Sequence, residues 1–405
     1  MMKKILIIDH YSQLPGEPGN NRFIYLAELL CQSGYCVEIV TTRFSHKQKK
    51  VREIDQSIFE GLPYQFTLLD EPGYPRNVCL SRFYSHFKFG EELEKYLNTI
   101  DRPDMIYAAV PSLDVGRVAG KFCEKHQIPF FLDIQDLWPE AFKLVFHVPV
   151  LSDIIFAPMK WTADSFYQKA SKIIAVSDTY KDRGLVRGGI DHQGLCVYLG
   201  TDLARFDEYA KTSNPEKPNG EIWVAYVGTL GHSYNIEIII DALGKLEQSI
   251  TSHVVFKVFG DGPLMDRFQE YAQKAPVRVD FLGRMDYPEM VSKLCQADIA
   301  VNPISKGAAQ SIINKHADYA AAGLPVVSTQ ESPEYQDLLQ KYECGINCSP
   351  DDALQVAQAL ERLICDADLR TRMGNNSRKM AEECFDRRRT YVKIVDEIKK
   401  VVGDT

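Results

Sequence analysis

The chain has 405 residues and a formal net charge of −8 at neutral pH. Its composition, with 45% hydrophobic and 25% charged residues, lies within ordinary globular usage, and its length predicts two domains of near-equal size. The acidic balance argues against a nucleic-acid-binding protein, which would carry a basic domain. No run approaches the ~18 consecutive apolar residues that a membrane span requires.

The N-terminus combines two lysines with the apolar run Ile5–Ile8, as a signal peptide would. The run ends at Asp9 and no small-residue cleavage site follows, so we expect a first strand and a cytoplasmic protein. Of the ten cysteines, Cys344 and Cys348 have ligand-like spacing, but no second pair or nearby histidine completes a zinc site. We therefore expect reduced structural thiols, no metal site and no cofactor.

Strand-like and helix-like runs alternate in the first half of the chain. The strand Lys4–Ile8, the helix Arg22–Ser33 and the strand Cys36–Thr41 form a βαβ pattern, which is typical of parallel sheets with helices on their faces. The same pattern predicts a helix over Leu113–Lys125 and further strands over Met105–Ala109, Phe130–Asp133 and Lys172–Val176.

The stretch Lys211–Gly220 has no apolar residue and two prolines, the composition of a solvated linker. We therefore expect a first domain over residues 1–210, a linker over 211–220 and a second domain over 221–390. A final amphipathic run predicts a C-terminal helix within 391–405, and its periodicity leaves open whether it packs on the second domain or crosses back to the first. The second domain repeats the alternation, with strands Trp223–Val227, Val254–Phe259, Val279–Phe281, Asp298–Val301 and Leu324–Ser328 and helices Ile236–Leu246, Leu264–Gln273, Ile313–Ala322 and Asp352–Ile364.

Glycine-rich loops follow the first strand of each predicted domain. In open parallel sheets, ligands bind beyond the carboxyl ends of the strands, where helix N-termini offer free N–H groups. The first loop contains Gly16 and Gly19 but lacks the dinucleotide pattern, so a plain flexible loop remains an alternative. The second contains Gly228, Thr229 and Gly231. If the two loops face each other, they can grip a diphosphate.

Two further segments of the second domain predict donor contacts. The strand ending at Phe259 runs into Gly260 and Gly262, whose lack of side chains would leave room for a base or ribose. Lys315 and Asp318 are three residues apart on a predicted helix and so share a face. Lysine can neutralise phosphate oxygens and a carboxylate can hold ribose hydroxyls. An ordinary exposed lysine–aspartate pair is the alternative.

In the first domain, Asp133 to Glu140 follows an apolar strand and contains three carboxylates and a tryptophan. Such residues at the carboxyl end of a strand are suited to chemistry or hydroxyl recognition, which makes Asp136, Trp138 and Glu140 candidate site residues. A helix-entry turn, with Asp136 as cap and Pro139 in the first turn, is the alternative. The two interpretations are compatible.

Taken in order, the segments "GNNRFIYLAELL", "RFSHKQK", "DIQDLWPE", "VYLGTD", "YVGTLG", "VFGDGP", "FLGR" and "NKHADYAAAGLPVV" resemble glycosyltransferase family 4. Within it the chain is similar to the bacterial fucosamine-transferase type that builds surface polysaccharides. The resemblance covers nearly the whole chain. It implies an α/β GT-B fold, in which two Rossmann-like domains with parallel sheets face each other across a deep cleft.

The resemblance also implies a retaining enzyme without a metal ion. The donor nucleotide is held mainly by the second domain, and UDP is favoured. The diphosphate charge is met by Lys315, by N–H groups of Gly228–Gly231 and by helix dipoles. Bond breakage through an oxocarbenium-like transition state is followed by acceptor attack on the same face.

The chain departs from the family pattern in its donor site. Two glutamates eight residues apart are usual, and here the second maps to Asp318 and the first to the uncharged Gln310. Thr229 replaces a usual arginine, and a usual lysine falls near Tyr234 or Asn235. These changes place more of the phosphate charge on Lys315 and on Arg284.

For the acceptor side we expect Asp136 nearest the anomeric centre, as base, orienting group or charge stabiliser. His46 is a candidate substrate contact, with an idle surface histidine as the alternative. The segments Arg43–Arg52 and Arg82–Lys88 combine cations with aromatics. Because saccharide acceptors are often lipid-linked, these segments indicate peripheral contact with an anionic membrane, and a merely solvated face is the alternative.

The expected activity is sugar transfer to a saccharide or lipid-linked acceptor in the synthesis of capsule, O-antigen or another surface polysaccharide. A GT-B epimerase or phosphorylase is a rival enzyme, although the acid–base residues of the former and the cofactor lysine of the latter are not identifiable. A non-catalytic sugar-nucleotide-binding partner is a rival of another class, and the uncharged Gln310 keeps it open.

Overall fold

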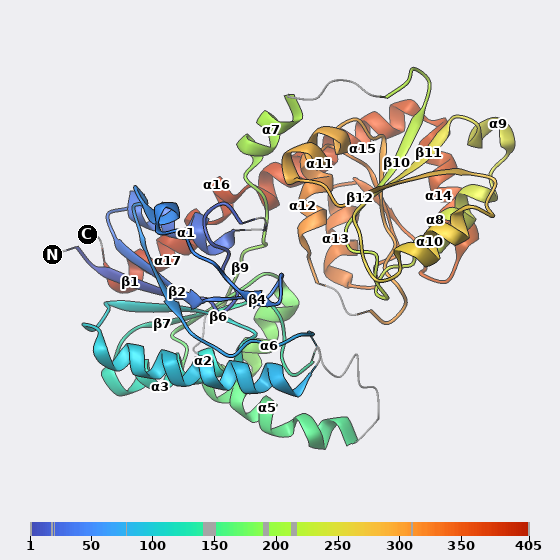
Figure 1. Ribbon diagram of the computed structural model, residues 1–405. Helices are drawn as coiled ribbons and strands as arrows, with labels where there is room; N and C mark the ends of the chain where they lie inside the picture. Colours follow the sequence, from blue (N-terminus) through green and yellow to red (C-terminus); the bar gives the residue numbers. More distant parts are fainter. Residues whose placement is uncertain are drawn as a thin grey trace. The chain divides into compact units, whose positions relative to one another are not determined.

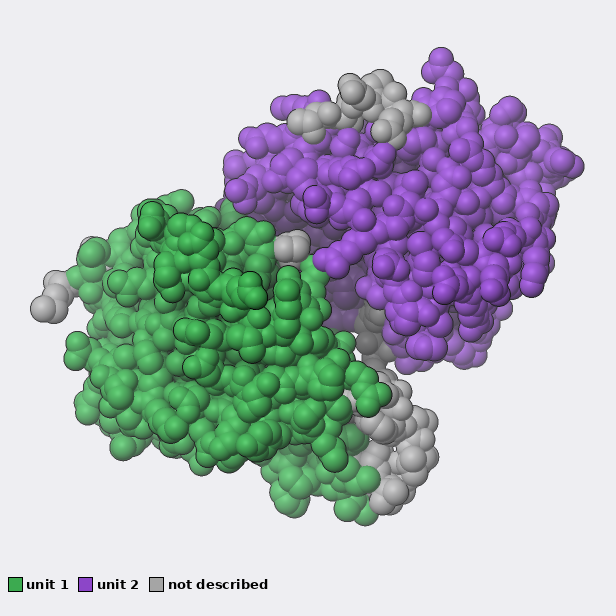
Figure 2. All heavy atoms as spheres, in the orientation of Figure 1, with its two compact units in different colours: residues 1–198, 391–405 green, residues 199–390 purple. Residues whose placement is uncertain are grey.

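The structure is a computed structural model, and it describes residues 2–17, 19, 21–77, 79–140, 151–188, 194–211, 217–308 and 311–403. The chain divides into two compact units (Figure 2). Unit 1 consists of residues 1–198 and 391–405, and unit 2 consists of residues 199–390. Each unit contains its own parallel sheet with packed helices (Figure 1), as the βαβ pattern predicts.

Unit 1 is built on a seven-stranded parallel sheet with the order β5-β2-β1-β6-β7-β8-β9. A small antiparallel hairpin of β3 and β4 follows β2. The strands are β1 (Lys4–Ile8), β2 (Cys36–Thr42), β3 (Phe44–Ser45), β4 (Lys50–Val51), β5 (Gln65–Leu69), β6 (Met105–Val110), β7 (Phe130–Ile134), β8 (Lys172–Ala175) and β9 (Gly194–Cys196).

Alternate residues of β1 enter two different cores, because successive side chains of a strand point to opposite faces. Leu6 and Ile8 pack with the helices on one face of the sheet, and Ile5 and Ile7 pack with those on the other. The first face is covered by α2 (Leu80–Thr99), α3 (Leu113–His126) and α5 (Leu151–Tyr167), and the second by α1 (Arg22–Gln32) and α17 (Val392–Val402). Unit 1 also contains η1 (Gln56–Phe59) and α6 (Asp178–Gly188).

Unit 2 has a six-stranded parallel sheet with the order β12-β11-β10-β13-β14-β15. Its strands are β10 (Ile222–Val227), β11 (Val254–Phe259), β12 (Arg278–Gly283), β13 (Ile299–Asn302), β14 (Val326–Ser328) and β15 (Gly345–Asn347). Its helices are α7 (Leu203–Lys211), α8 (Ile236–Gly244), α9 (Gln248–Thr251), α10 (Met265–Ala272), α11 (Tyr287–Leu294), α12 (Asn314–Ala321), α13 (Pro333–Lys341), α14 (Ala353–Cys365), α15 (Ala367–Met380), η2 (Ala381–Phe385) and α16 (Arg387–Thr390).

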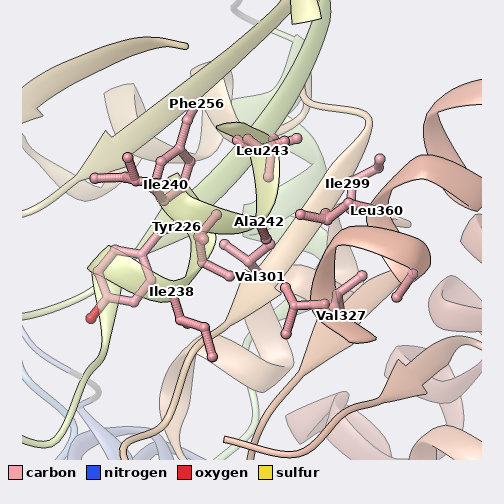
Figure 3. Close-up of a cluster of buried hydrophobic side chains, with 14 of the residues drawn as sticks. Tyr226, Ile238, Ile240, Ala242, Leu243, Phe256, Ile299, Val301, Val327 and Leu360 are labelled. Carbon is pink, nitrogen blue, oxygen red and sulfur yellow. The ribbon is translucent and has the colours of Figure 1, made fainter. Parts of the chain in front are cut away.

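The main core of unit 2 lies between its sheet and the helices α8 and α14. In Figure 3, Ile238 and Leu243 of α8 and Leu360 of α14 converge on strand residues such as Phe256 and Val301. Helix α8 is apolar around most of its circumference, with six of its nine residues buried, which explains why it lies deep in the unit. This core fixes β10, whose carboxyl end carries a candidate site loop.

The unit boundaries differ from those that the composition predicts. Residues 199–211 cluster with unit 2 and not with the first domain, because α7 packs against α11. The C-terminal helix belongs to unit 1, where Ile394, Val395 and Ile398 join the core beside α1. The proposed linker falls partly on residues 212–216, which lie outside the described residues. The sequence predicts no element at several of the observed helices and strands, among them α2, α5, α6, α7, α11, α13, α15, β5, β9 and β15.

In each sheet the chain adds strands first toward one edge and then, after a single reversal of strand order, toward the other edge. In unit 1 the reversal lies between β1 and β6, and in unit 2 between β10 and β13. Ligands of open α/β sheets bind at the carboxyl ends of such strand pairs. The loops after β1, β6, β10 and β13 are therefore the first places to look for a site. None of the helices in the described part of the chain is long and apolar enough to cross a bilayer.

Candidate active site

Lys315 lies at the carboxyl edge of the unit 2 sheet, in the first turn of α12. Its side chain is buried, with only 6% of the residue exposed, and its ammonium has no hydrogen-bond partner among the described residues. Nζ lies 4.2 Å from the ring centre of Tyr226 and 3.8 Å from that of Tyr234. A Cβ atom at Gly228 would be 2.8 Å from the same Nζ. The side chain thus ends beside the glycine loop that follows β10.

Burial lowers the pKa of Lys315 well below its usual value, because removing water penalises the charged form. The two tyrosine rings compensate in part, since the face of an aromatic ring attracts a cation. Neither Lys315 nor Asp318, which is 8% exposed, is a surface residue, and no ion pair joins them. The alternative of an ordinary exposed lysine–aspartate pair is therefore wrong. A buried ammonium without an acceptor favours an anionic ligand.

The glycines after β10 and β11 are required where these two loops pack against each other. A Cβ atom at Gly260 would lie 1.9 Å from the carbonyl oxygen of Gly228, and one at Gly262 would lie 2.4 Å from that of Leu230. The space beside both glycines is occupied by backbone. We expected these glycines to leave room for a base or ribose, but the backbone of the neighbouring loop fills the space beside them.

The N–H groups of Gly228–Gly231 are only partly available to a ligand. The N–H of Gly228 donates to Phe259 O at 2.9 Å and that of Leu230 donates to Asp261 O at 3.0 Å. Among the described residues no acceptor is recorded for the N–H groups of Thr229 and Gly231. The expected run of phosphate-binding amides is thus reduced to two, because the loop uses the others to fix its own shape.

Asp318 follows Lys315 by one turn of α12 but faces a different group. The Tyr287 hydroxyl donates to Asp318 Oδ1 at 2.7 Å, and Thr201 Oγ1 lies 3.1 Å from the same hydroxyl. Burial raises the pKa of Asp318 from 3.8 to about 6, although the Tyr287 hydrogen bond and the charge of Arg387 act in the opposite direction. The carboxyl group therefore titrates within two units of neutral pH.

The remaining donor-side candidates are dispersed. Arg284 is exposed beyond β12. Gln310 lies outside the described residues. In unit 1, Gly16 has a left-handed φ of 82°, and a Cβ there would have no described atom within 4 Å, whereas a Cβ at Gly19 would lie 2.8 Å from the Gln13 side chain. Gly16 thus meets the need for a positive φ in the loop after β1.

Asp136 lies directly beyond β7 in unit 1 and is half-buried. Its Oδ1 accepts from the Leu137 N–H at 2.9 Å and from the Tyr180 hydroxyl at 3.5 Å. The pKa of Asp136 is raised, because burial outweighs these hydrogen bonds and the Arg82 charge, which act in the opposite direction. The alternative role as a helix cap falls partly on residues 141–150, which lie outside the described part of the chain.

Trp138 and Glu140 are engaged within unit 1. Trp138 is buried and stacks on His86 at a ring distance of 5.6 Å, with the Arg82 guanidinium carbon 4.5 Å from its ring centre. Glu140 Oε1 accepts from Arg183 Nε at 2.5 Å, and its other oxygen is buried with no partner among the described residues, which exclude 141–150. The side chains of Trp138 and Glu140 are thus held by protein groups.

His46 belongs to an aromatic and cationic cluster at the carboxyl edge of the unit 1 sheet. Its Nδ1 lies 2.5 Å from the Tyr74 hydroxyl, and its ring lies 4.9 Å from that of Tyr11. Burial lowers the pKa of His46 to about 4, followed by the charges of Lys49 and Arg82. The alternative of an idle surface histidine is wrong, since the ring is partly buried and engaged.

Several residues of these arrangements escaped the sequence analysis. Tyr226 and Tyr287 were not candidates, because an isolated tyrosine carries no spacing signal that would connect it to Lys315 or Asp318. His10 was passed over as part of a loop, although its Nδ1 lies 2.9 Å from Ser112 Oγ and its Nε2 3.0 Å from Glu71 Oε1. Its position directly after the first strand could have identified it.

A surface hollow of unit 2 lies away from these residues. It is lined by residues such as Asp298, Leu324 and Pro325, which precede β13 and β14 at the amino ends of the strands. Ligands of open parallel sheets bind at the opposite ends. The hollow is therefore not the candidate active site.

Residues 208–380 match the family model described as Glycosyl transferases group 1. A Campylobacter jejuni protein named GalNAc-alpha-(1->4)-GalNAc-alpha-(1->3)-diNAcBac-PP-undecaprenol alpha-1,4-N-acetyl-D-galactosaminyltransferase is 23% identical over 211 residues, which are 48% of this chain and 52% of the relative. A glycogen synthase of Mycobacterium tuberculosis is 26% identical over 46% of this chain and 44% of its own length. The chain thus spans about half the length of the curated relatives it matches.

Solved structures resemble the chain over its whole length. The sucrose-phosphate synthase of Thermosynechococcus elongatus has a TM-score of 0.74 at 17% identity and covers 100% of both chains. HepE of Anabaena in complex with UDP has a TM-score of 0.70 at 16% identity over 98% of this chain and 100% of its own. Identities this low show the fold alone. The chain therefore has the α/β GT-B fold with two Rossmann-like domains, and its residues 208–380 are similar to the glycosyl transferases group 1.

Proposed function

We propose that the protein is a retaining glycosyltransferase that takes a sugar from a nucleotide diphosphate donor, UDP being the favoured nucleotide. The observation that carries the proposal is the buried ammonium of Lys315, which has no hydrogen-bond partner in the part of the chain that the structure describes and lies beside the glycine loop after β10. This position is at the carboxyl edge of the sheet, where the strand order reverses. A diphosphate supplies the anionic oxygens that such an ammonium lacks.

The donor is proposed to bind unit 2 through complementary groups. Lys315 and the N–H groups of Thr229 and Gly231 bind the diphosphate, and the positive end of the α12 dipole adds to the attraction. Asp318 accepts hydrogen bonds from ribose hydroxyls. Arg284 and Gln310 are proposed as further donor contacts, and Gly260 and Gly262 as residues that hold the loop in shape. Support comes from Anabaena HepE, a protein of similar fold whose solved complexes contain UDP and UDP-glucose.

In the reaction, the bond between the sugar and the diphosphate breaks through an oxocarbenium-like transition state, and the acceptor attacks the same face. The electron pair of the broken bond leaves with the diphosphate, and the acceptor proton passes to a donor-phosphate oxygen or to Asp136. A raised pKa suits Asp136 to holding that proton. Gly16 and Gly19 are proposed as further donor contacts. No metal ion takes part in this scheme.

The acceptor is proposed to be a saccharide or lipid-linked saccharide of capsule, O-antigen or another surface polysaccharide, as in the fucosamine-transferase type. Support comes from the Campylobacter jejuni relative, whose name specifies an undecaprenol-linked acceptor. We place the acceptor beside His46 and Asp136, with Trp138 and Glu140 shaping the wall behind them. The protein then acts in the cytoplasm, at the inner face of the cell membrane.

Peripheral membrane contact is proposed for the outward face of α2. Leu80, Phe83, Tyr84 and Phe87 recur at helical spacing on this face and are all exposed, and the β3–β4 hairpin adds the exposed Lys50. Apolar and aromatic side chains flanked by cations suit the anionic headgroup region. Vesicles with anionic lipid should retain the protein at low salt, and the Phe87→Ser variant should be retained less. Leu354→Ser, which removes an exposed leucine of unit 2, is the control. Without retention of the parent protein, the membrane contact is abandoned.

The donor site is tested by thermal-shift titration with a panel of nucleotide sugars. A ligand at 100 times its dissociation constant adds about 2.7 kcal/mol to the stability of the state that binds it. Lys315→Ala should abolish the shift. Lys306→Ala is the matched control, because this exposed lysine pairs with Asp351 outside the candidate site. If the Lys315→Ala variant holds nucleotide sugars as tightly as the parent, the functional assignment is wrong.

The rival functions give different outcomes with the same material. An epimerase isomerises the donor sugar without an acceptor, whereas a transferase only hydrolyses it slowly. For a transferase, Asp136→Asn should abolish this hydrolysis and leave nucleotide affinity unchanged. A non-catalytic partner binds the donor with no turnover across all acceptors tried.

A further inference from the structure

Lys49 and Arg82 of unit 1 have no carboxylate partner among the described residues, whereas Arg43 and Arg52 nearby each have one. Arg82 of α2 is buried, with 8% of the residue exposed. Its guanidinium donates to Asn77 O at 2.8 Å, to the Tyr11 hydroxyl at 3.0 Å and to His86 Nε2 at 3.4 Å. All three acceptors are formally neutral. By contrast, Arg52, which directly follows β4, donates to both carboxylate oxygens of Glu17 at 2.8 Å.

The second cation is Lys49, at the turn of the β3–β4 hairpin. Its Nζ lies 4.9 Å from the ring centre of Tyr74, which also lies 5.5 Å from the Arg82 guanidinium carbon. Lys49 donates to Asn77 Oδ1 and lies 3.3 Å from His46 Nδ1. Burial and then the Arg82 charge lower the pKa of Lys49 to about 8. Unlike Arg82, Lys49 is only partly buried and remains accessible to a ligand.

The neighbouring titratable groups do not neutralise this charge. His46 and His86 are held neutral, because burial and the nearby cations lower the pKa of both rings. The carboxylate of Glu71 acts electrostatically on His46 and Tyr74 of this cluster and also interacts with His10 and the Ser85 hydroxyl. Two like charges therefore stand close together, and the single negative charge of Glu71 does not balance both, which costs free energy in the empty protein. Such an arrangement is typical of a site for an anion.

We propose that Lys49 and Arg82 form a subsite for a phosphate group of the acceptor. The proposal refines the function proposed above, and it rests on that function for the identification of the bound molecule as the acceptor. Phosphate is favoured over a carboxylate, because a phosphate monoester carries a charge of about −1.5 to −2 at neutral pH and so matches two cations better. Arg82 supplies charge, since each of its three nitrogens already donates to the protein, and the accessible ammonium of Lys49 supplies the direct contact, as lysine does at many phosphate sites.

The subsite lies within reach of the proposed chemistry. The Arg82 guanidinium carbon is 4.5 Å from the ring centre of Trp138, two residues beyond Asp136, and the Arg82 charge acts on the Asp136 carboxyl. The apolar face of α2, with Leu80 and Phe83, borders the same helix turn as Arg82. A phosphate bound here therefore orients an acceptor toward Asp136. Lys49 and Arg82 are proposed as residues that select a phosphorylated acceptor.

The test is calorimetric titration of the full-length protein with two phosphate monoesters, in the presence of saturating UDP to occupy the donor site. Geranyl phosphate represents a lipid phosphate and glucose 1-phosphate represents a phosphosugar. Lys49→Ala should weaken the binding of the better probe by about tenfold or more, since a hydrogen bond to a charged group is lost. Lys50→Ala removes the adjacent exposed lysine of the same hairpin and should change the affinity less than about twofold.

Comparing the two probes identifies the source of the phosphate. Tighter binding of geranyl phosphate assigns a lipid phosphate, and tighter binding of glucose 1-phosphate assigns a phosphosugar. The inference is overturned if neither probe binds, if Lys49→Ala binds as the parent does, or if Lys50→Ala weakens binding equally. Lys49→Arg, which keeps the charge, should retain most of the affinity and so excludes misfolding as the cause of a loss.

Failure here is separable from failure of the donor site. Nucleotide-sugar binding by Lys315→Ala tests only the donor site, and phosphate binding by Lys49→Ala tests only the unit 1 subsite. A variant pair in which Lys315→Ala loses the donor and Lys49→Ala keeps the phosphate would overturn this inference alone.

Discussion

The ionisation of Asp318 connects a single residue to donor binding. With its pKa raised to about 6, the carboxyl group of the free protein is protonated below that pH. A protonated carboxyl can no longer accept hydrogen bonds from two ribose hydroxyls. The affinity for a nucleotide sugar should therefore fall as the pH drops through about 6. Titration of a UDP-sugar by calorimetry from about pH 8 to about pH 5 measures this.

Asp318→Asn is the control for that titration. The amide does not ionise, so its affinity should be lower and nearly constant over the same range. The sign for stability is opposite to that of a paired carboxylate: the folded state binds the proton more tightly, so stability falls as the pH rises from 3.8 to about 6. If Asp318→Asn shows the same acid loss of affinity as the parent, another group is responsible.

Gly260 tests how the donor-site loops hold each other. Gly260→Ala would place a Cβ 1.9 Å from the Gly228 carbonyl oxygen at a φ of 140°, which a side chain rarely adopts. Clash and backbone strain should together cost at least about 2 kcal/mol, visible as a lower melting temperature and a lost response to donor. Gly231→Ala is the matched control, because its Cβ would meet only Thr229 Cγ2 at 3.8 Å. Equal stability of the two variants would contradict the packing argument.

At the scale of elements, α17 is the best case for a long-range contribution to the unit 1 core. Ile398 is fully buried beside α1 and β1, in the cluster that contains Ile5 and Ile7. Ile398→Ala should destabilise unit 1 by about 2 to 5 kcal/mol, the usual cost of such a cavity. Val401→Ala, on the exposed side of the same helix, should change stability by less than about 0.5 kcal/mol. Hydrogen exchange of the β1 amides measures both.

Elements with strong periodicity were predicted from the sequence to within one or two residues. β1 and β11 have the predicted bounds, and α12 differs by one residue at each end. The sequence reading left out α2, although its inward face is regular, because its outward face carries Leu80, Tyr84 and Phe87 where a surface helix has polar residues. β9 and β15 have only three residues each. Such short strands form because a neighbouring strand pairs with them, and the local sequence carries no signal of that pairing.

At the scale of the molecule, unit 2 is one continuous segment of the chain, whereas unit 1 is formed by two separate segments. The first and last segments of unit 2 are joined to each other, since Thr201 pairs with Asp386 and Arg387 donates to Leu199 O and Gly200 O. Residues 199–390 expressed alone should therefore fold and, if unit 2 binds the donor, should be stabilised by a nucleotide sugar. A thermal-shift titration of this fragment measures both properties.

The complementary fragment supplies the counter-test. Residues 1–198 lack α17 and should be unstable, because the part of the sheet face beside α1 that α17 covers is then exposed. Joining 391–405 to residue 198 through a short glycine linker should restore folding, since Arg22 Nη1 contacts both Tyr198 O and the Tyr391 hydroxyl. A stable fragment 1–198 with no gain from the added helix would show that α17 is dispensable.

The sequence by itself determined the class of the protein. Alternating strand and helix periods specify parallel sheets, and the ordered glycine loops with "NKHADYAAAGLPVV" predicted the fold family and singled out Lys315 and Asp318. These signals are local, since period and spacing are properties of contiguous residues.

Only the tertiary structure decided the partners of these residues. It placed Tyr226 and Tyr234 against Lys315, paired Asp318 with Tyr287, buried Trp138 and set Lys49 close to Arg82. It also assigned α17 to unit 1. The reason is physical: hydrogen bonds, desolvation and charge interactions depend on distance in space, and residues in contact, such as Arg22 and Tyr391, lie as much as 369 positions apart in the chain.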